Sequence, residues 1–257
     1  MGPDFRVGRV LGTAWTVYMK NFTPFSLVAL VLLLPLLFFQ LFVLANPSMG
    51  GDEVAKFGVY AILSIVLTQL VTATVVYGTI QELRQHSVSA GEALTRGLAT
   101  ALPVLGVAIV ASTIVIATVA AVLFAVTIAT DSALFSLLLA IIPGITLFVM
   151  FWLAVPVAVV EGPGVFASLK RSVFLTKGNR WRILGLFVVL WLIYFLISMV
   201  MEVAFMATGA LGIYPYIGYV LAALFTVMFA VVSAVGYHDL RRLRDGVDID
   251  GIGAAFD

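Results

Sequence analysis

Five cations lie within the segment KRSVFLTKGNRWR, residues 170–182, and no acidic residue interrupts them. Lysine and arginine bind phosphate through charge-assisted hydrogen bonds, and an arginine can offer two parallel N–H donors. Each cation near an anionic leaflet gains on the order of 1 kcal/mol. We therefore predict contact with the phosphate headgroups of anionic lipids at Lys170, Arg171, Lys177, Arg180 and Arg182.

A second group of charges flanks the same segment. Glu161 ends an apolar stretch directly before the sequence GPG, and Asp239 and Arg241 follow the last apolar stretch. A carboxylate at a membrane edge is stabilised by a nearby cation, for which Arg171, Lys170 and Arg241 are candidates. We predict a structural polar clamp at the inner rim, formed by Glu161, Asp239 and Arg241. A proton or substrate site at Glu161 is the alternative.

The usual catalytic and metal-binding patterns do not occur in the sequence. It has no cysteine and only two histidines, His86 and His238, which lie in separate segments. Metalloprotease HExxH, hydrolase GxSxG and P-loop patterns are missing. The tail DGVDIDG has three aspartates but lacks the spacing and closing glutamate of a calcium loop. We therefore expect no enzyme activity, no cofactor and no metal.

The composition identifies lipid as the solvent of most of the chain. Of the 257 residues, 63% are hydrophobic and 11% are charged, and the mean hydropathy is +1.17. A soluble domain carries about 25% charged residues, so too little polar surface remains to cover a globule in water. The net charge of +1 gives no global field that would favour nucleic acid.

Six apolar stretches are long enough to cross the hydrocarbon core, which takes about 20 residues. Backbone groups in lipid must be paired within each segment, so these spans are helices and the fold is all-α. Glu202, near the outer end of the fifth span, is their only charged residue. The spans are residues 23–45, 57–80, 102–128, 133–160, 183–206 and 216–237.

The distribution of lysine and arginine orients these spans. Thirteen of the fourteen cations flank the spans on one side, and only Lys56 lies on the other. Cytoplasmic segments carry such an excess, so both termini are expected in the cytoplasm. The start MGPDFRVGRV has no apolar segment of a cleavable signal peptide.

Short amphipathic helices are predicted on the inner side, each before a hairpin of two spans. The first covers residues 5–22, the second starts with the capping-box pattern SAGE at Ser89, and the third starts near residue 165. Its apolar face is expected at Phe166, Leu169 and Val173, with Ser168 and Arg171 opposite. The apolar face of the first is expected at Val7, Leu11, Ala14, Trp15 and Tyr18.

The domain prediction is a single transmembrane domain, residues 1–237, and a cytoplasmic tail, residues 238–257. Small residues at four-residue spacing predict where helices touch inside the domain, because close approach drives helix packing in lipid. Gln69 lies mid-span and should face protein. The small-residue stripes are Ala117–Ala121–Ala125 on the third span, and Gly218–Ala222 and Ala230–Ala234 on the sixth.

Residues 153–186, LAVPVAVVEGPGVFASLKRSVFLTKGNRWRILGL, resemble a known family. This is the membrane-domain family fused to some bacterial glycerophosphodiester phosphodiesterases, with the related YciC-type inner-membrane proteins. The start VGRVLGTAWTVYMKNF and the end YHDLRRLRDG are similar to it as well. The resemblance implies lipid-related work and a glutamate at position 161. It implies no catalytic residues, because the phosphodiesterase chemistry belongs to a separate soluble domain.

Three classes of function follow from these patterns. The first is a non-catalytic inner-membrane protein, a lipid-contacting scaffold or envelope-organising factor. The second is a transporter or lipid-moving protein with a cavity between the hairpins, and the third is an integral membrane enzyme acting on lipids. The expected partners are membrane lipids with anionic headgroups, and then other membrane proteins or a second copy of the chain. Nucleic acid is not expected.

Overall fold

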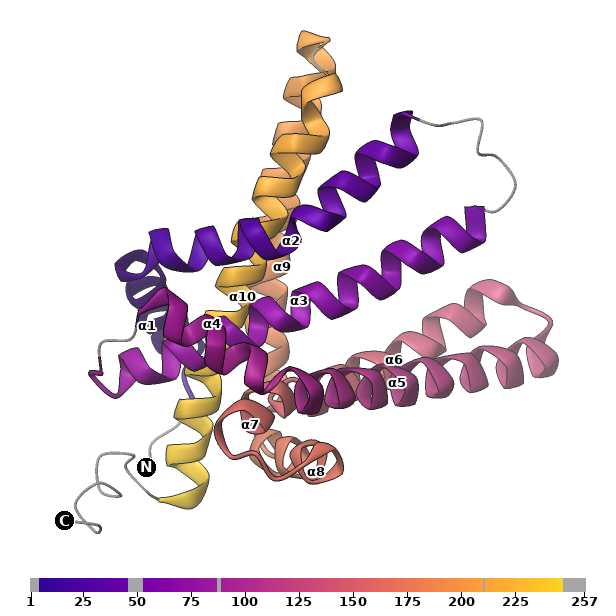
Figure 1. Ribbon diagram of the computed structural model, residues 1–257. Helices are drawn as coiled ribbons and strands as arrows, with labels where there is room; N and C mark the ends of the chain where they lie inside the picture. The colour runs from indigo at the N-terminus through magenta and orange to yellow at the C-terminus, as the bar shows by residue number, and fades with distance from the viewer. Residues whose placement is uncertain (1–4, 46–52, 87–88, 210, 247–257) are drawn as a thin grey trace.

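The computed structural model describes residues 5–45, 53–86, 89–209 and 211–246, and all regular structure in these residues is helical (Figure 1). The elements are α1 (Val7–Lys20), α2 (Phe22–Ala45), α3 (Glu53–Leu83), α4 (Ala90–Ala99), α5 (Ala101–Thr130), α6 (Ala133–Phe151), α7 (Ala154–Val160), α8 (Val165–Thr176), α9 (Arg180–Thr208), the 3₁₀ turn η1 (Leu211–Ile213) and α10 (Tyr214–Asp245).

Six helical segments are long and apolar enough to cross a membrane by length and composition: α2, α3, α5, α6 with α7, α9 and α10. The chain is therefore a multi-pass membrane protein, and the predicted all-α class with six such helices is confirmed. The helices extend past the predicted spans, since α10 continues to Asp245 and so includes the start of the predicted tail. Asp248 and Asp250 of that tail lie outside the described residues.

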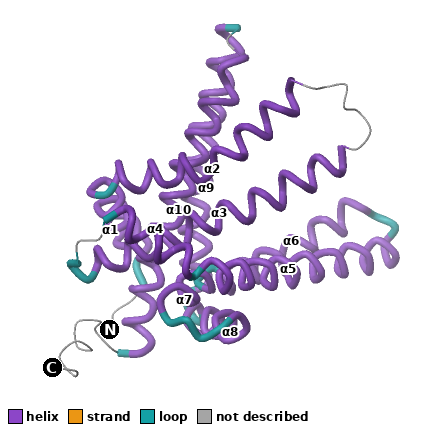
Figure 2. Tube along the Cα trace, viewed as in Figure 1, coloured by secondary structure: helices purple, strands orange, loops and turns teal. Residues whose placement is uncertain are grey.

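The long helices form three contacting pairs, α2 with α3, α5 with α6, and α9 with α10. Figure 1 shows these pairs diverging from one common end, where the short helices α1, α4, α7 and α8 lie. The turn between α5 and α6 is at the opposite end (Figure 2). Helix α10 contacts α1, α2, α3, α7, α8 and α9, so it is the centre of the base.

Close packing at the base requires a glycine on α10. A Cβ added to Gly236 would lie 2.5 Å from Cη2 of Trp152, at the end of α6. The indole of Trp152 also packs edge-on against Phe187 of α9, with ring centroids 5.0 Å apart. Gly236 therefore allows the Trp152 ring to fill the space between α9 and α10.

The fourth predicted span, residues 133–160, is not one continuous helix. Helix α6 ends at Phe151 and α7 begins at Ala154. Pro156 has no N–H to donate four residues back and clashes with the carbonyl of Trp152, so a break is expected here. Ser172 of α8 satisfies the opened backbone, because its hydroxyl accepts from Leu153 N–H at 3.1 Å and donates to Met150 C=O at 2.7 Å.

Helix α8 buries Leu169 of its predicted apolar face, together with serines that were expected on the opposite side. Phe166 is 76% exposed, while Ser168 and Ser172 are buried. Both hydroxyls donate to main-chain carbonyls, Ser168 to Gly164 at 2.8 Å, so burying them costs little. The buried residues of α8 are Ser168, Leu169, Ser172, Leu175 and Thr176.

The buried face of α1 is rotated from the predicted one. Trp15, placed on the apolar face by sequence, is 55% exposed. Helix α1 packs against α9 and α10, which the sequence pattern does not identify. Its buried residues are Val10, Ala14, Val17 and Tyr18. On α4 the capping prediction is confirmed, since Ser89 Oγ accepts from Glu92 N–H at 3.2 Å.

The small-residue stripes have different outcomes. Ala230 and Ala234 are buried on α10, as predicted. Ala117, Ala121 and Ala125 are exposed on α5, because no other described helix lies against that face. Helix α5 instead joins α6 through Thr127, whose hydroxyl donates to Ser136 Oγ at 2.9 Å.

Replacing Ser172 with alanine will destabilise the base. The change leaves Leu153 N–H and Met150 C=O without a partner in a buried region, which costs about 1–3 kcal/mol. Thermal unfolding of the purified chain in detergent measures the loss. Ser64→Ala is the control, because Ser64 Oγ bonds only the Ala61 carbonyl of its own helix. Equal unfolding temperatures for the two variants would contradict the role of Ser172.

Candidate functional site

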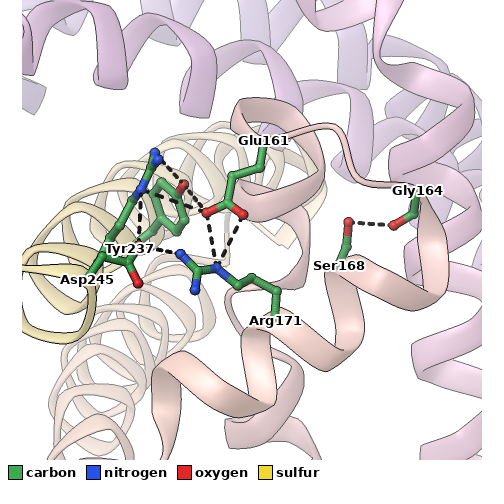
Figure 3. A network of polar contacts seen from close by, with 7 residues as sticks. Glu161, Gly164, Ser168, Arg171, Tyr237 and Asp245 are labelled. Atoms are coloured by element: carbon green, nitrogen blue, oxygen red, sulfur yellow. Dashed lines mark hydrogen bonds and ion pairs between the residues drawn. The ribbon is translucent and has the colours of Figure 1, made fainter. Parts of the chain in front are cut away.

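A polar network lies at the base, where α7, α8 and α10 meet (Figure 3). Glu161 is the C-terminal cap of α7 and Arg171 lies on α8. Between them the chain reverses through Gly162 and Gly164, whose φ angles of +61° and +91° suit glycine. This turn brings α8 back along α7, so that Arg171 faces Glu161.

Three residues of α10 complete the network. Tyr237, Arg241 and Asp245 are spaced four apart, so they share one face of the helix. Arg171 Nε donates to Glu161 Oε2 at 3.2 Å and to Oε1 at 3.3 Å, and the Arg171 guanidinium also donates to Asp245. The Tyr237 hydroxyl donates to Glu161 Oε1 at 2.8 Å and accepts from Arg241 at 3.1 Å.

The charges in this network balance. Arg241 Nε lies 3.6 Å from an Asp245 oxygen and 3.9 Å from a Glu161 oxygen, so two guanidinium groups face two carboxylates. The four side chains are 20–25% exposed. The hydrogen bond to Asp245 raises the pKa of Arg171 above its usual range, so Arg171 stays cationic. Each acid is paired with an arginine, so the network joins α7, α8 and α10.

An aromatic ring extends the contact between α8 and α10. Phe174 lies between two guanidinium groups, with Arg171 at 5.7 Å and Arg244 at 5.5 Å from its ring centroid. Arg244 also donates to the main-chain carbonyl of Lys177, directly after α8. Contacts at Arg171, Phe174 and Lys177 therefore attach the C-terminal half of α8 to α10.

Asp239 lies outside the network, contrary to the predicted clamp. Two residues after Tyr237, it is rotated by about 200° around α10 and faces another side. There it pairs with Arg9 of α1 at 2.8 Å. Its expected place is taken by Asp245, which sequence reasoning missed. The four-residue spacing from Tyr237 through Arg241 to Asp245 is the signal that could have identified it.

The five cations of residues 170–182 do not form one patch. Arg171 directs donors at Glu161 and Asp245, so it belongs to the polar network. Lys170, Lys177 and Arg182 are exposed, and Arg182 also donates to the Phe5 carbonyl at 3.3 Å. Arg180 is different again, because its Nε is buried without a hydrogen-bond partner in the described part of the chain.

Two cavities lie among the long helices. One, of about 360 Å³, is bounded by α3, α5, α6, α7 and α10, and Gln69 faces it as predicted. The other, of about 320 Å³, lies between α2, α3, α9 and α10 and is lined by Gln40, Ser64, Thr68 and Tyr219 among others. The hydroxyls of Ser64 and Thr68 donate to carbonyls of their own helix.

Two further titratable groups lie away from the network. Glu202 is exposed on α9, and His86 is exposed after α3. Within the described residues, no three histidine or acidic side chains are grouped closely enough to hold a metal ion. Comparisons with models of known protein families, with curated proteins and with solved structures find no match to this chain.

The network predicts energetic coupling between Arg171 and Asp245. In a double-mutant cycle of Arg171→Met and Asp245→Asn, we expect a coupling of about 1 kcal/mol, because the pair is partly exposed. Unfolding of the single and double variants in detergent measures it. The control cycle combines Lys170→Met with Asp245→Asn, since Lys170 is an exposed cation on α8, the helix that carries Arg171. A coupling no larger than that of the control would contradict the network.

Proposed function

We propose that the chain is a non-catalytic inner-membrane protein of bacteria, a lipid-contacting scaffold or envelope-organising factor. The observation that supports this is the surface of residues 166–182. Phe166 is 76% and Trp181 84% exposed, and they lie in the same segment as the exposed Lys170 and Lys177. Aromatic rings beside cations are the side-chain pairing that a membrane–water interface favours.

The polar network supports the same reading. Its acids are paired with arginines of neighbouring helices, which is the arrangement expected of a structural clamp. Its position between α7, α8 and α10 fixes the orientation of α8. The network therefore presents the aromatic and cationic residues of this segment to the membrane on a rigid base.

The topology is part of the proposal. The six spans form three hairpins, each preceded by a helix that lies at the cytoplasmic interface, and both termini are cytoplasmic. The one-sided distribution of cations supports this orientation. The resemblance of residues 153–186 to the YciC-type membrane proteins supports the location, and the cations and Glu161 belong to that stretch.

A transporter is the second candidate. The cavity between α2, α3, α9 and α10 favours it, because Gln40, Tyr60 and Tyr194 line it at the level of the spans. Several of its polar groups are already used, since Thr226 donates within α10 and Tyr219 donates to the Leu30 carbonyl. The scaffold therefore remains the better supported function.

Cysteine labelling tests the topology, because the chain has no cysteine. Thr130→Cys, at the C-terminal end of α5, should react in intact cells with a maleimide that does not cross the inner membrane. Gly91→Cys, on α4, should react only after the cells are lysed. Both positions are exposed, so accessibility within the protein is matched. The reverse pattern would overturn the orientation.

Anionic lipid should stabilise the protein through the exposed cations. In nanodiscs, the unfolding temperature of the wild type should rise as phosphatidylglycerol replaces phosphatidylcholine. The combined variant Lys170→Gln, Lys177→Gln and Arg182→Gln should lose most of this rise. Arg96→Gln, a single change on α4, is the control for loss of a cation elsewhere on the inner side. A wild type indifferent to lipid charge would refute lipid contact.

A further inference from the structure

A third hollow, of about 310 Å³, lies between α6 and the beginning of α9. Its walls are apolar side chains of both helices, among them Ile141, Ile142 and Ile145 of α6 and Leu184 of α9. These isoleucines are exposed, so the hollow is a groove on the lipid-facing surface. Arg180 and Trp181 line its other end, at the start of α9.

Arg180 brings a guanidinium group to this groove. Its Nε is itself buried, and within the described residues that atom has no hydrogen-bond partner. A phosphate oxygen in the groove would pair with the rest of the guanidinium through charge-assisted bonds. Among the five cations of residues 170–182, Arg180 is the one that lines this groove.

The first turn of α9 adds positive potential at the same place. It contains Arg180 and Arg182 and no acidic residue, and the Asn179 side chain makes no capping hydrogen bond. The N-terminal end of a helix carries partial positive charge, so placing two arginines there is electrostatically unfavourable. An anion bound beside Arg180 would relieve both effects.

We propose that this groove binds one anionic phospholipid, with its phosphate on Arg180 and one acyl chain along Ile141, Ile145 and Leu184. The inference rests on the proposed lipid-contacting function and assigns it a specific site. The apolar wall explains why the ligand is a lipid, since a free phosphate would leave the groove unfilled. The arginine explains why an uncharged chain or an apolar helix face fits less well. Trp181 then lies at the level of the headgroup.

Lipid titration of the full chain in detergent tests the site. Phosphatidylglycerol should raise the unfolding temperature of the wild type saturably, and inorganic phosphate alone should not. Arg180→Gln should need about fivefold more phosphatidylglycerol for half of the effect, which is the loss of one cation–phosphate contact. Ile145→Trp keeps the charge but fills the groove, so it should weaken the response as well.

Matched controls separate the site from general effects. Ile193→Trp makes the same change at an exposed position of α9, on the face opposite Leu184, and should respond like the wild type. Arg96→Gln removes an exposed cation on α4, which does not line the groove, and should also leave the half-saturating concentration unchanged. Unfolding temperatures without lipid show whether each variant is folded.

The outcomes distinguish failure of the proposed function from failure of the groove assignment alone. If phosphatidylglycerol stabilises the wild type no better than phosphatidylcholine does, the proposed function fails together with the site. If it stabilises the wild type and both Arg180→Gln and Ile145→Trp equally, the groove assignment alone is overturned. If light scattering shows that Ile145→Trp dissociates an oligomer, the groove is a contact between copies, and the lipid site is likewise overturned.

Discussion

The break in the fourth span is the constraint on which the base of the protein depends. Pro156 interrupts the backbone hydrogen bonds between α6 and α7, and an unpaired backbone group is costly away from water. Ser172 pairs with both sides of the break, so α8 has to lie against it. The turn through Gly162 and Gly164 makes that return possible. Once α8 is in place, Arg171 reaches Glu161 and Asp245, and α10 joins the same base.

This arrangement divides the inner charges into two kinds. Arg171 and Arg241 are paired with acids, and their contribution is to hold three helices in register. Lys170 and Lys177 are carried on the outside of the same fixed helix and the turn that follows it. A dense cationic segment in the sequence is therefore divided between internally paired cations and exposed cations. Only the three-dimensional structure assigns each cation to one of them.

The sequence correctly predicted the features that depend on residues close together in the chain. Apolar length identified the six spans, and the Ser89 cap of α4 follows from residues three apart. The errors concern contacts between distant segments. Asp239 was expected at the clamp because it is an acid at the right depth, but helix rotation directs it to Arg9. Ser168 and Ser172 were expected opposite the apolar face of α8, but both are buried with main-chain carbonyls as partners. Sequence periodicity does not reveal those partners.

Because the helix pairs diverge, much of the surface of the outer helices has no contact with the rest of the described chain. Only 6% of the most apolar window of α5 is buried within the protein, against 39% for α10. The alanine stripe of α5, at Ala117, Ala121 and Ala125, consequently faces outwards. Protein contacts hold the base, whereas lipid supplies most of the packing around the outer helices. Any lipid that binds the folded chain preferentially stabilises it by mass action, so membrane composition acts on the same equilibrium as the internal contacts.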